Sequence, residues 1–209
     1  MNQPVSGIPQ MLPTQVIDTT TYTREILAHA NRVARQRGLQ DWFVCDIDAH
    51  HVETVHWAEI VKYIDDPVIR DTAMQFHQDR VGAPPYGLNG DLGLRYQGAG
   101  GRIPHQDGVR EKVDDTSVHR DVVLTQRAMN SLGVDIMVVF PTPMLFLGLH
   151  PQPEMEVWLC RAYNRWMVEN ILSADDRIKF LAVLPYNTPV EAERVVKEMA
   201  KEKGVICFC

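Results

Sequence analysis

The sequence predicts an α/β protein in which helices cover a parallel sheet. Three observations support this prediction. Short apolar runs alternate with amphipathic helical patterns from about residue 42 onward. After residue 116 the connections between them are only a few residues long. Glycine or proline bounds most of the elements. Strict alternation with short connections is typical of βαβ units, in which consecutive strands run parallel.

The N-terminal part is expected to hold an arm and one helix. Residues 1–19 are rich in Pro, Thr and Gln, which predicts an irregular arm. The stretch "TYTREILAHANRVARQRGLQ" has Ile26, Leu27, Ala30 and Val33 at helical spacing and reaches Gly38 as a stop. We therefore divide the chain into residues 1–40, the arm and helix, and residues 41–209, the α/β domain.

The domain begins with one strand and one short helix. The apolar run before "DID" predicts a buried strand at residues 43–48, and "WAEIVKYI" predicts a helix that ends near Pro67. Residues 67–116 show no sustained periodicity and contain many Gly and Pro residues, which predicts a long insertion. Long irregular segments in compact domains are often functional, so this insertion is a candidate cover for a site.

After the insertion the pattern is regular. Helices are expected at 116–133, 153–176 and 189–204, and strands at 134–140, 178–184 and 205–209. Thr116 or Ser117 is the expected N-cap of the first of these helices, and Gly133 its stop. Tyr163, Trp166 and Met167 share one helix face and are expected to be core residues.

Composition excludes several kinds of partner. The chain has 209 residues, 45% of them hydrophobic, and a net charge of −6. This charge gives no basic surface for nucleic acid or anionic lipid, and the apolar runs are too short to cross a membrane. The first residues show no secretory signal, so we expect a cytoplasmic protein. The four cysteines form no CxxC pair and are expected to be reduced structural thiols.

The first strand ends in ionisable residues. Because active sites of parallel α/β proteins gather at the carboxyl ends of the strands, Asp46, Asp48 and His50 are site candidates. Alternate residues of a strand share a face, so Asp48 and His50 could form a two-ligand clamp for a divalent ion such as zinc. The alternative is that the acids cap a helix beginning near Val55 and that the histidines are solvated.

The stretch "CDIDAHHVE" resembles the first-strand metal motif of the amidohydrolase-related family, in the branch of aminocarboxymuconate-semialdehyde and resorcylate decarboxylases. The resemblance continues through "SLGVDIMVVFPTP", "RAYNRWMVENILSADDRIKFLAVLP" and "EKGVICF", roughly from Val44 to the end. It implies a TIM-type (β/α)₈ barrel, of which about the first four βα units are present here. It also implies metal-dependent hydrolysis or non-oxidative decarboxylation of a small carboxylic acid, often aromatic or unsaturated.

The resemblance assigns Asp48 and His50 as metal ligands, for zinc or alternatively manganese. Glu53 matches an acid that often follows the motif, with helix capping as its alternative. His51 faces the other way from His50. It is expected either to support a metal ligand without binding the metal itself or to be solvated. The family completes its site with a histidine and an aspartate from later strands. We therefore expect an N-terminal portion that is nearly inactive alone and self-associates as a homo-oligomer; the rival is a small open sheet that is complete in itself.

Further candidates lie in the loops. Thr142, His150 and Asn187 follow the second and third strands, and His150 could transfer a proton near neutral pH. His105 and Arg102 in the insertion could reach over the site. For each of these the alternative is an ordinary loop residue. The rival to an enzyme acting on a carboxylic acid is a non-catalytic α/β module that binds another protein.

Overall fold

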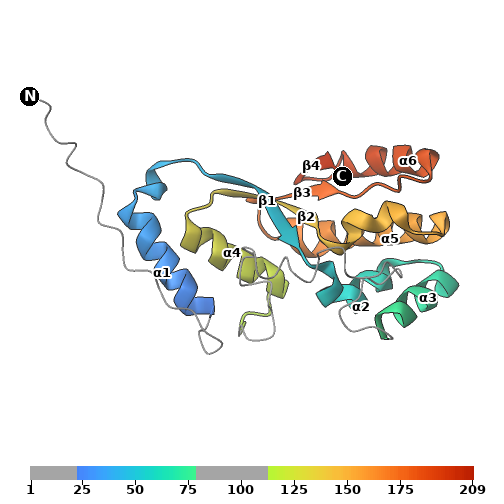
Figure 1. The fold of residues 1–209 in the computed structure, drawn as a ribbon, viewed down its shortest axis with the longest axis horizontal. Coiled ribbons are helices and arrows are strands. Elements are labelled where there is room, and N and C mark those ends of the chain that lie inside the picture. The colour runs from blue at the N-terminus through green and yellow to red at the C-terminus, as the bar shows by residue number, and fades with distance from the viewer. Residues whose placement is uncertain (1–22, 79–112) are drawn as a thin grey trace, which may run out of the picture.

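Four parallel strands form the centre of the fold (Figure 1). The computed structural model describes residues 23–78 and 113–209. The strands pair in sequence order: β1 Cys45–His51, β2 Ile136–Pro141, β3 Ile178–Ala182 and β4 Val205–Phe208. Each consecutive pair is parallel, which requires a crossover between the two strands. The predicted α/β class with a parallel sheet is confirmed.

β1 differs in two ways from the expected strand at residues 43–48. It begins at Cys45 and pairs with β2 as far as His51, while Trp42 and Phe43 precede it with exposed fractions of 71% and 76%. The expectation that these aromatic residues belong to a buried strand is wrong. The pairing register also shifts between Asp46 and Ala49, so the simple alternation expected from Asp46 to His50 is interrupted.

The helix α1, Thr23–Gln36, packs beside α4, Arg120–Leu132 (Figure 1). Gly133 ends α4 in the left-handed conformation with φ of 75°, as predicted. The N-cap is His119, whose ring accepts the Asp121 N–H, so the prediction of Thr116 or Ser117 is wrong.

The expected insertion is shorter than predicted, because its beginning is helical. α2, Trp57–Ile60, is followed by a 3₁₀ turn at Val61–Tyr63 and then by α3, Pro67–Gln78. The Asp66 carboxylate accepts the N–H groups of Val68 and Ile69 and so opens α3. Residues 79–112 lie outside the described part, and with them the candidates Arg102 and His105.

α5, Pro153–Met167, supplies the centre of the core. Tyr163, Trp166 and Met167 are buried, which confirms the prediction from their spacing. The helix continues into a π-helical turn at Val168–Leu172, in which Ile171 and Leu172 are buried. α6, Pro189–Met199, follows β3 and buries Val195 and Met199.

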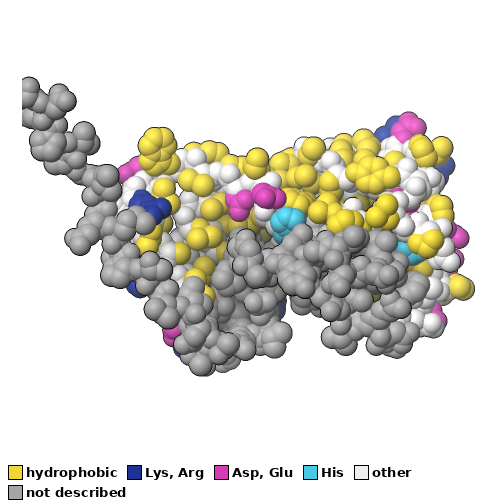
Figure 2. All heavy atoms as spheres, viewed as in Figure 1, with side chains coloured by type: hydrophobic (Ala, Val, Ile, Leu, Met, Phe, Trp, Pro, Cys, Tyr) yellow, Lys and Arg dark blue, Asp and Glu magenta, His cyan; other side chains and the backbone are white. Residues whose placement is uncertain are grey.

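The two faces of the sheet are buried to different extents by the surrounding elements. In β3, buried Ile178, Phe180 and Ala182 alternate with half-buried Lys179 and Leu181. Apolar side chains spread over the face seen in Figure 2. Exposed apolar residues of the strands include Ile47 at 74% and Ile206 at 56%. Helices therefore pack against one face, while the other is only partly covered by the described residues. None of the helices within the described ranges is long and apolar enough to cross a bilayer.

Candidate functional site

Asp48 and His50 lie together at the carboxyl end of β1. His50 Nε2 is 3.5 Å from Asp48 Oδ1, and His50 Nδ1 is 3.1 Å from Thr142 Oγ1. The His50 ring also lies against Phe140, the residue opposite it in β2, with ring centroids 4.3 Å apart. Thr142 is buried, whereas the Asp48 side chain is 82% exposed. The structure thus brings three of the predicted residues together, with Asp48 open to solvent.

This pair has the chemistry of a partial metal site. Zinc takes imidazole nitrogen and carboxylate oxygen at about 2.0–2.2 Å, which places tetrahedral ligand atoms about 3.3–3.6 Å apart. The observed separation of 3.5 Å between His50 Nε2 and Asp48 Oδ1 fits this value. Among the side chains that the structure describes, no third histidine, cysteine or acid groups with the pair. The two residues could hold a divalent ion but would need further ligands.

Glu53 joins the loop after β1 to the loop after β2. Its side chain is fully buried, and its carboxylate accepts the backbone N–H of Thr142 at 3.1 Å and also that of Met144. A buried carboxylate is stable in such a place because N–H donors compensate its lost hydration. Glu53 therefore fixes the backbone that carries Thr142, the residue in contact with His50.

His150 and Asn187 both have local hydrogen-bond partners, and Asn187 connects two loops. His150 is buried, and its Nδ1 accepts the Gln152 N–H at 3.0 Å near the start of α5. Burial lowers the pKa of His150 below the usual value for histidine. Asn187 donates from its side chain to the Gly148 carbonyl at 2.7 Å, and its N–H reaches the buried Glu156. These contacts tie the loop after β3 to the loop after β2.

A second polar cluster, not found from the sequence, lies on the opposite, helix-covered side. We call it the outer cluster. It consists of five residues from β1, from the turn before α2, from α2 and from the start of α4: His51, His56, Glu59, His119 and Asp121. Their side chains, Glu59 excepted, are 11–21% exposed. The solvated alternative for His51 is therefore wrong.

The outer cluster centres on the Asp121 carboxylate. Asp121 Oδ2 is 3.1 Å from His51 Nε2 and 2.9 Å from His56 Nε2. The other ring nitrogen of His51 is 2.9 Å from the Tyr163 hydroxyl. The His51 and His56 rings are nearly parallel, and Trp166 stacks on both at 5.4 and 5.5 Å.

A second group of contacts surrounds Glu59. Its carboxylate lies 3.6 Å from His56 Nδ1 and 3.2 Å from His119 Nε2. The Trp166 indole N–H donates to the same carboxylate at 3.4 Å. Glu59 therefore joins His56 to His119.

These contacts shift the protonation of the outer cluster. Burial alone would raise the pKa of Asp121, yet hydrogen bonds from His51 and His56 hold it well below its usual range. Burial likewise opposes the charge of His56, but Asp121 and Glu59 raise its pKa. For Glu59, burial is outweighed by the nearby His56 and His119, which lower its pKa. For His119 burial is the largest effect, and its pKa is lowered. Both carboxylates are ionised at neutral pH.

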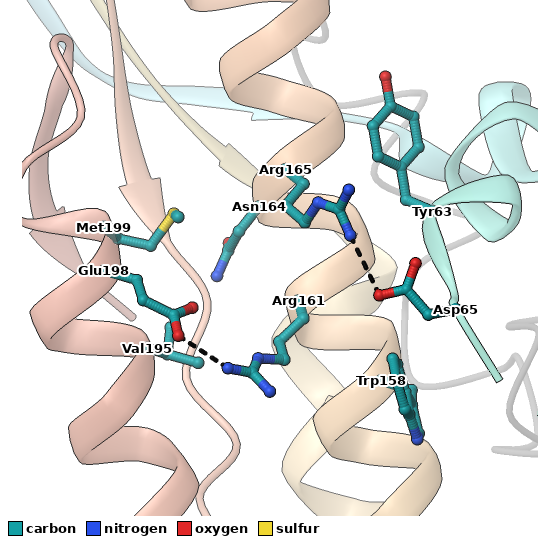
Figure 3. A pocket seen from close by; sticks show the side chains of 9 residues that line it. All are labelled: Tyr63, Asp65, Trp158, Arg161, Asn164, Arg165, Val195, Glu198 and Met199. Atoms are coloured by element: carbon teal, nitrogen blue, oxygen red, sulfur yellow. Dashed lines mark hydrogen bonds and ion pairs between the residues drawn. The ribbon is translucent and has the colours of Figure 1, made fainter.

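A cavity of about 250 Å³ lies between α5, α6 and the turn at Val61–Tyr63 (Figure 3). Its two guanidinium groups are paired with acids: Arg161 with Glu198 at 2.8 Å, and Arg165 with Asp65 at 3.4 Å. These pairs cross from α5 to α6 and from α5 to the segment before α3. The two arginines of the cavity are therefore neutralised by acids that also line it, and these ion pairs hold neighbouring elements together.

Comparison with models of known protein families gives no match to this chain, and comparison with curated proteins gives none either. The class is therefore defined by the fold and the side chains alone. It is an α/β protein with a parallel sheet, a carboxylate–imidazole pair at the carboxyl end of β1, and a histidine-rich cluster beneath the helices.

Proposed function

We propose that the protein is a metal-dependent enzyme of the amidohydrolase-related type that hydrolyses or decarboxylates a small aromatic or unsaturated carboxylic acid. The observation that carries this proposal is the arrangement of Asp48, His50 and Thr142. It lies at the end of β1, where parallel α/β folds hold their active sites. A cytoplasmic location is part of the proposal and agrees with four free thiols.

The proposed fold is the first half of a (β/α)₈ barrel. In such a barrel each strand pairs in parallel with its neighbours in sequence order. The order β1-β2-β3-β4 supports this reading, as does the less covered face of the sheet, which would be the barrel interior. The N-terminal helix α1 would then lie outside the barrel, beside α4.

Each residue has a proposed role. Asp48 and His50 would hold a zinc or manganese ion, which in such sites polarises a substrate carboxylate or lowers the pKa of a bound water. Thr142 orients the His50 ring through Nδ1, and Glu53 orients the loop that carries Thr142. His150, with a pKa lowered by burial, is a neutral imidazole near pH 7 and is assigned to proton transfer.

Ligand binding and turnover test this proposal. Binding of a hydroxybenzoate or a muconate-type acid should require added Mn²⁺ or Zn²⁺ and should disappear in Asp48→Ala and in His50→Ala. Slow release of carbon dioxide would identify a decarboxylase, and a cleaved product a hydrolase. Circular dichroism establishes that both variants are folded. Equal metal-dependent binding in wild type and His50→Ala would refute the proposal.

The second candidate function is a non-catalytic interaction module. Exposed apolar residues on the sheet and at its margins, Ile47, Ile206 and Leu149 among them, favour it. An exposed apolar surface of this kind is typical of protein–protein contact sites. The same surface would support a homo-oligomer. Sedimentation at micromolar concentration separates the two: a metal-independent stable complex without carboxylic acid binding favours the module.

A further inference from the structure

The outer cluster has the donor set of a zinc site. His51 Nε2, His56 Nε2 and Asp121 Oδ2 converge on one point, and all three atoms lie within 4.8 Å of one another. The two nitrogens are 3.1 and 2.9 Å from the carboxylate oxygen. Zinc bonds of about 2.0–2.2 Å need ligand separations of about 3.3–3.6 Å, so each of the two nitrogen–oxygen distances would have to lengthen by a few tenths of an ångström.

The atoms around the three donors are placed as outer partners. A metal-bound histidine usually donates its second ring N–H to a carboxylate or another oxygen, which fixes the ring. For His51 that oxygen is the Tyr163 hydroxyl at 2.9 Å, and the Glu59 carboxylate forms an ion pair with the second ring nitrogen of His56 at 3.6 Å. The Asp121 backbone is held by His119 at 3.2 Å, and Trp166 stacks on both rings. The donors are thus oriented before any ion binds.

The cluster combines two carboxylates with three imidazoles. The side chains of Asp121 and of the three histidines are only 11–21% exposed, while Glu59 lies at the edge of the cluster. A divalent ion would neutralise both carboxylates. The donor side chains retain 11–21% of their exposure, so water can reach a fourth coordination position.

We infer that His51, His56 and Asp121 bind a zinc ion on the helix-covered side of the sheet, separate from Asp48 and His50. The ion would tie the end of β1 to the turn before α2 and to the first turn of α4. The turn before α2 follows β1 directly, whereas α4 begins much later in the sequence, and the ion pairs of His51 and His56 with α4 both involve Asp121. Because His50 precedes His51, such a site would stabilise the strand that carries the proposed enzymatic ligands.

The experiment uses the full chain carrying Asp48→Ala and His50→Ala, which removes the other candidate site. After removal of metal with a chelator, zinc is titrated in competition with a chromophoric chelator. We expect one zinc ion per chain and a rise in the melting temperature. Adding His56→Ala or Asp121→Asn should weaken binding at least about 100-fold, since even changes of outer partners cost 10–100-fold. Cobalt in place of zinc should give visible absorption bands of a four-coordinate ion that disappear with His56→Ala.

A matched control identifies the ligands. His29→Gln changes a histidine of α1 that lies outside the cluster, so zinc should bind as it does to the parent chain. Circular dichroism of each variant separates loss of binding from loss of folding. The inference is overturned if the Asp48→Ala, His50→Ala chain binds no zinc. It is also overturned if Asp121→Asn leaves the affinity unchanged, or if His29→Gln weakens it as strongly as His56→Ala does. None of these results bears on the proposed function. That function rests on Asp48 and His50, which are already replaced in the chain tested here.

Discussion

His50 and His51 are adjacent in sequence and face opposite sides of the sheet. His50 Nδ1 lies 3.1 Å from Thr142 Oγ1 at the end of β2, whereas His51 Nδ1 lies 2.9 Å from the Tyr163 hydroxyl on α5. The pleat of a strand sends successive side chains in opposite directions, which explains the separation. One dipeptide therefore contributes to two distinct polar sites.

Thr142→Val should weaken metal binding by Asp48 and His50 while leaving the fold intact. Valine has nearly the volume of threonine but cannot hydrogen-bond His50 Nδ1, so the ring loses its orientation. The loss of an outer partner typically lowers metal affinity about 10–100-fold. Manganese titration in a His56→Ala background reports this site alone. Thr142→Ser, which keeps the hydroxyl, should retain the wild-type affinity; an equal loss in both variants would contradict the assigned role.

Glu53→Gln should destabilise the protein by about 1–3 kcal/mol, the usual cost of leaving a buried donor unpaired. The amide offers one oxygen and one NH₂ group where two backbone N–H groups, of Thr142 and Met144, need acceptors. Urea unfolding measures the change. Glu193→Gln, which alters an exposed partner of Lys197, is the matched control and should change stability by less than about 0.5 kcal/mol.

Asn164→Leu should cost about 1–3 kcal/mol, because the buried Val183 N–H loses its acceptor while the Val183 carbonyl keeps the Cys160 thiol as a donor. The Asn164 amide donates to the Val183 carbonyl and accepts the Val183 N–H, both at 2.9 Å. Thermal and urea unfolding should both show the loss. Ser173→Ala removes an exposed bond to Glu169 and serves as the control. A stable Asn164→Leu variant would show that water replaces the amide at the end of β3.

Asp175 should stabilise the fold in a pH-dependent way. Burial opposes its charge, but hydrogen bonds from Arg177 and Gln126 outweigh burial and lower its pKa in the folded state. Its stabilisation is therefore complete above the unfolded value of about 3.9 and is lost as the pH falls through the lower folded value. The free energy of unfolding of Asp175→Asn should lie about 1 kcal/mol below wild type at pH 7. The difference should shrink in acid, and a constant difference would contradict the assignment.

The four cysteines should react with an alkylating reagent at different rates. Cys45 and Cys207 are exposed, while Cys160 is buried and its pKa is raised well above the usual value by burial. Burial also raises the pKa of Cys209 to about 11. Mass spectrometry at pH 8 should therefore show two rapidly modified thiols, and all four in urea. Rapid modification of Cys160 in the native protein would contradict the core packing around α5.

Local patterns were sufficient for most of the fold. The spacing of Tyr163, Trp166 and Met167 identified a buried helix face, and Gly133 identified the end of α4. The start of α4 was missed because Asp115 binds Ser117 itself, so His119 takes the capping position. The sequence does not predict α3, because its short apolar pattern follows a proline and runs into a stretch rich in glycine.

Only one of the two polar sites could be predicted from the sequence. Asp48 and His50 stand two residues apart, so their contact could be predicted from strand alternation, whereas the register shift between Asp46 and Ala49 could not. The outer cluster joins residues 51–59 to residues 119–121, and the docking of α4 brings them together. The dense run of His51, His56 and Glu59 was the only local signal, and it does not reveal that His119 and Asp121 complete the cluster.

The π-helical turn at Val168–Leu172 contains one residue more than a regular helical turn needs. Deleting a single residue there would convert it to an α-helical turn and rotate all that follows by about 100° relative to α5. Ile171 and Leu172 would leave the core, and the entry into β3 would shift. The segment thus fixes the rotation of the chain entering β3 about the axis of α5. Among homologues, length variation should therefore occur in the surface loops and be absent at this turn.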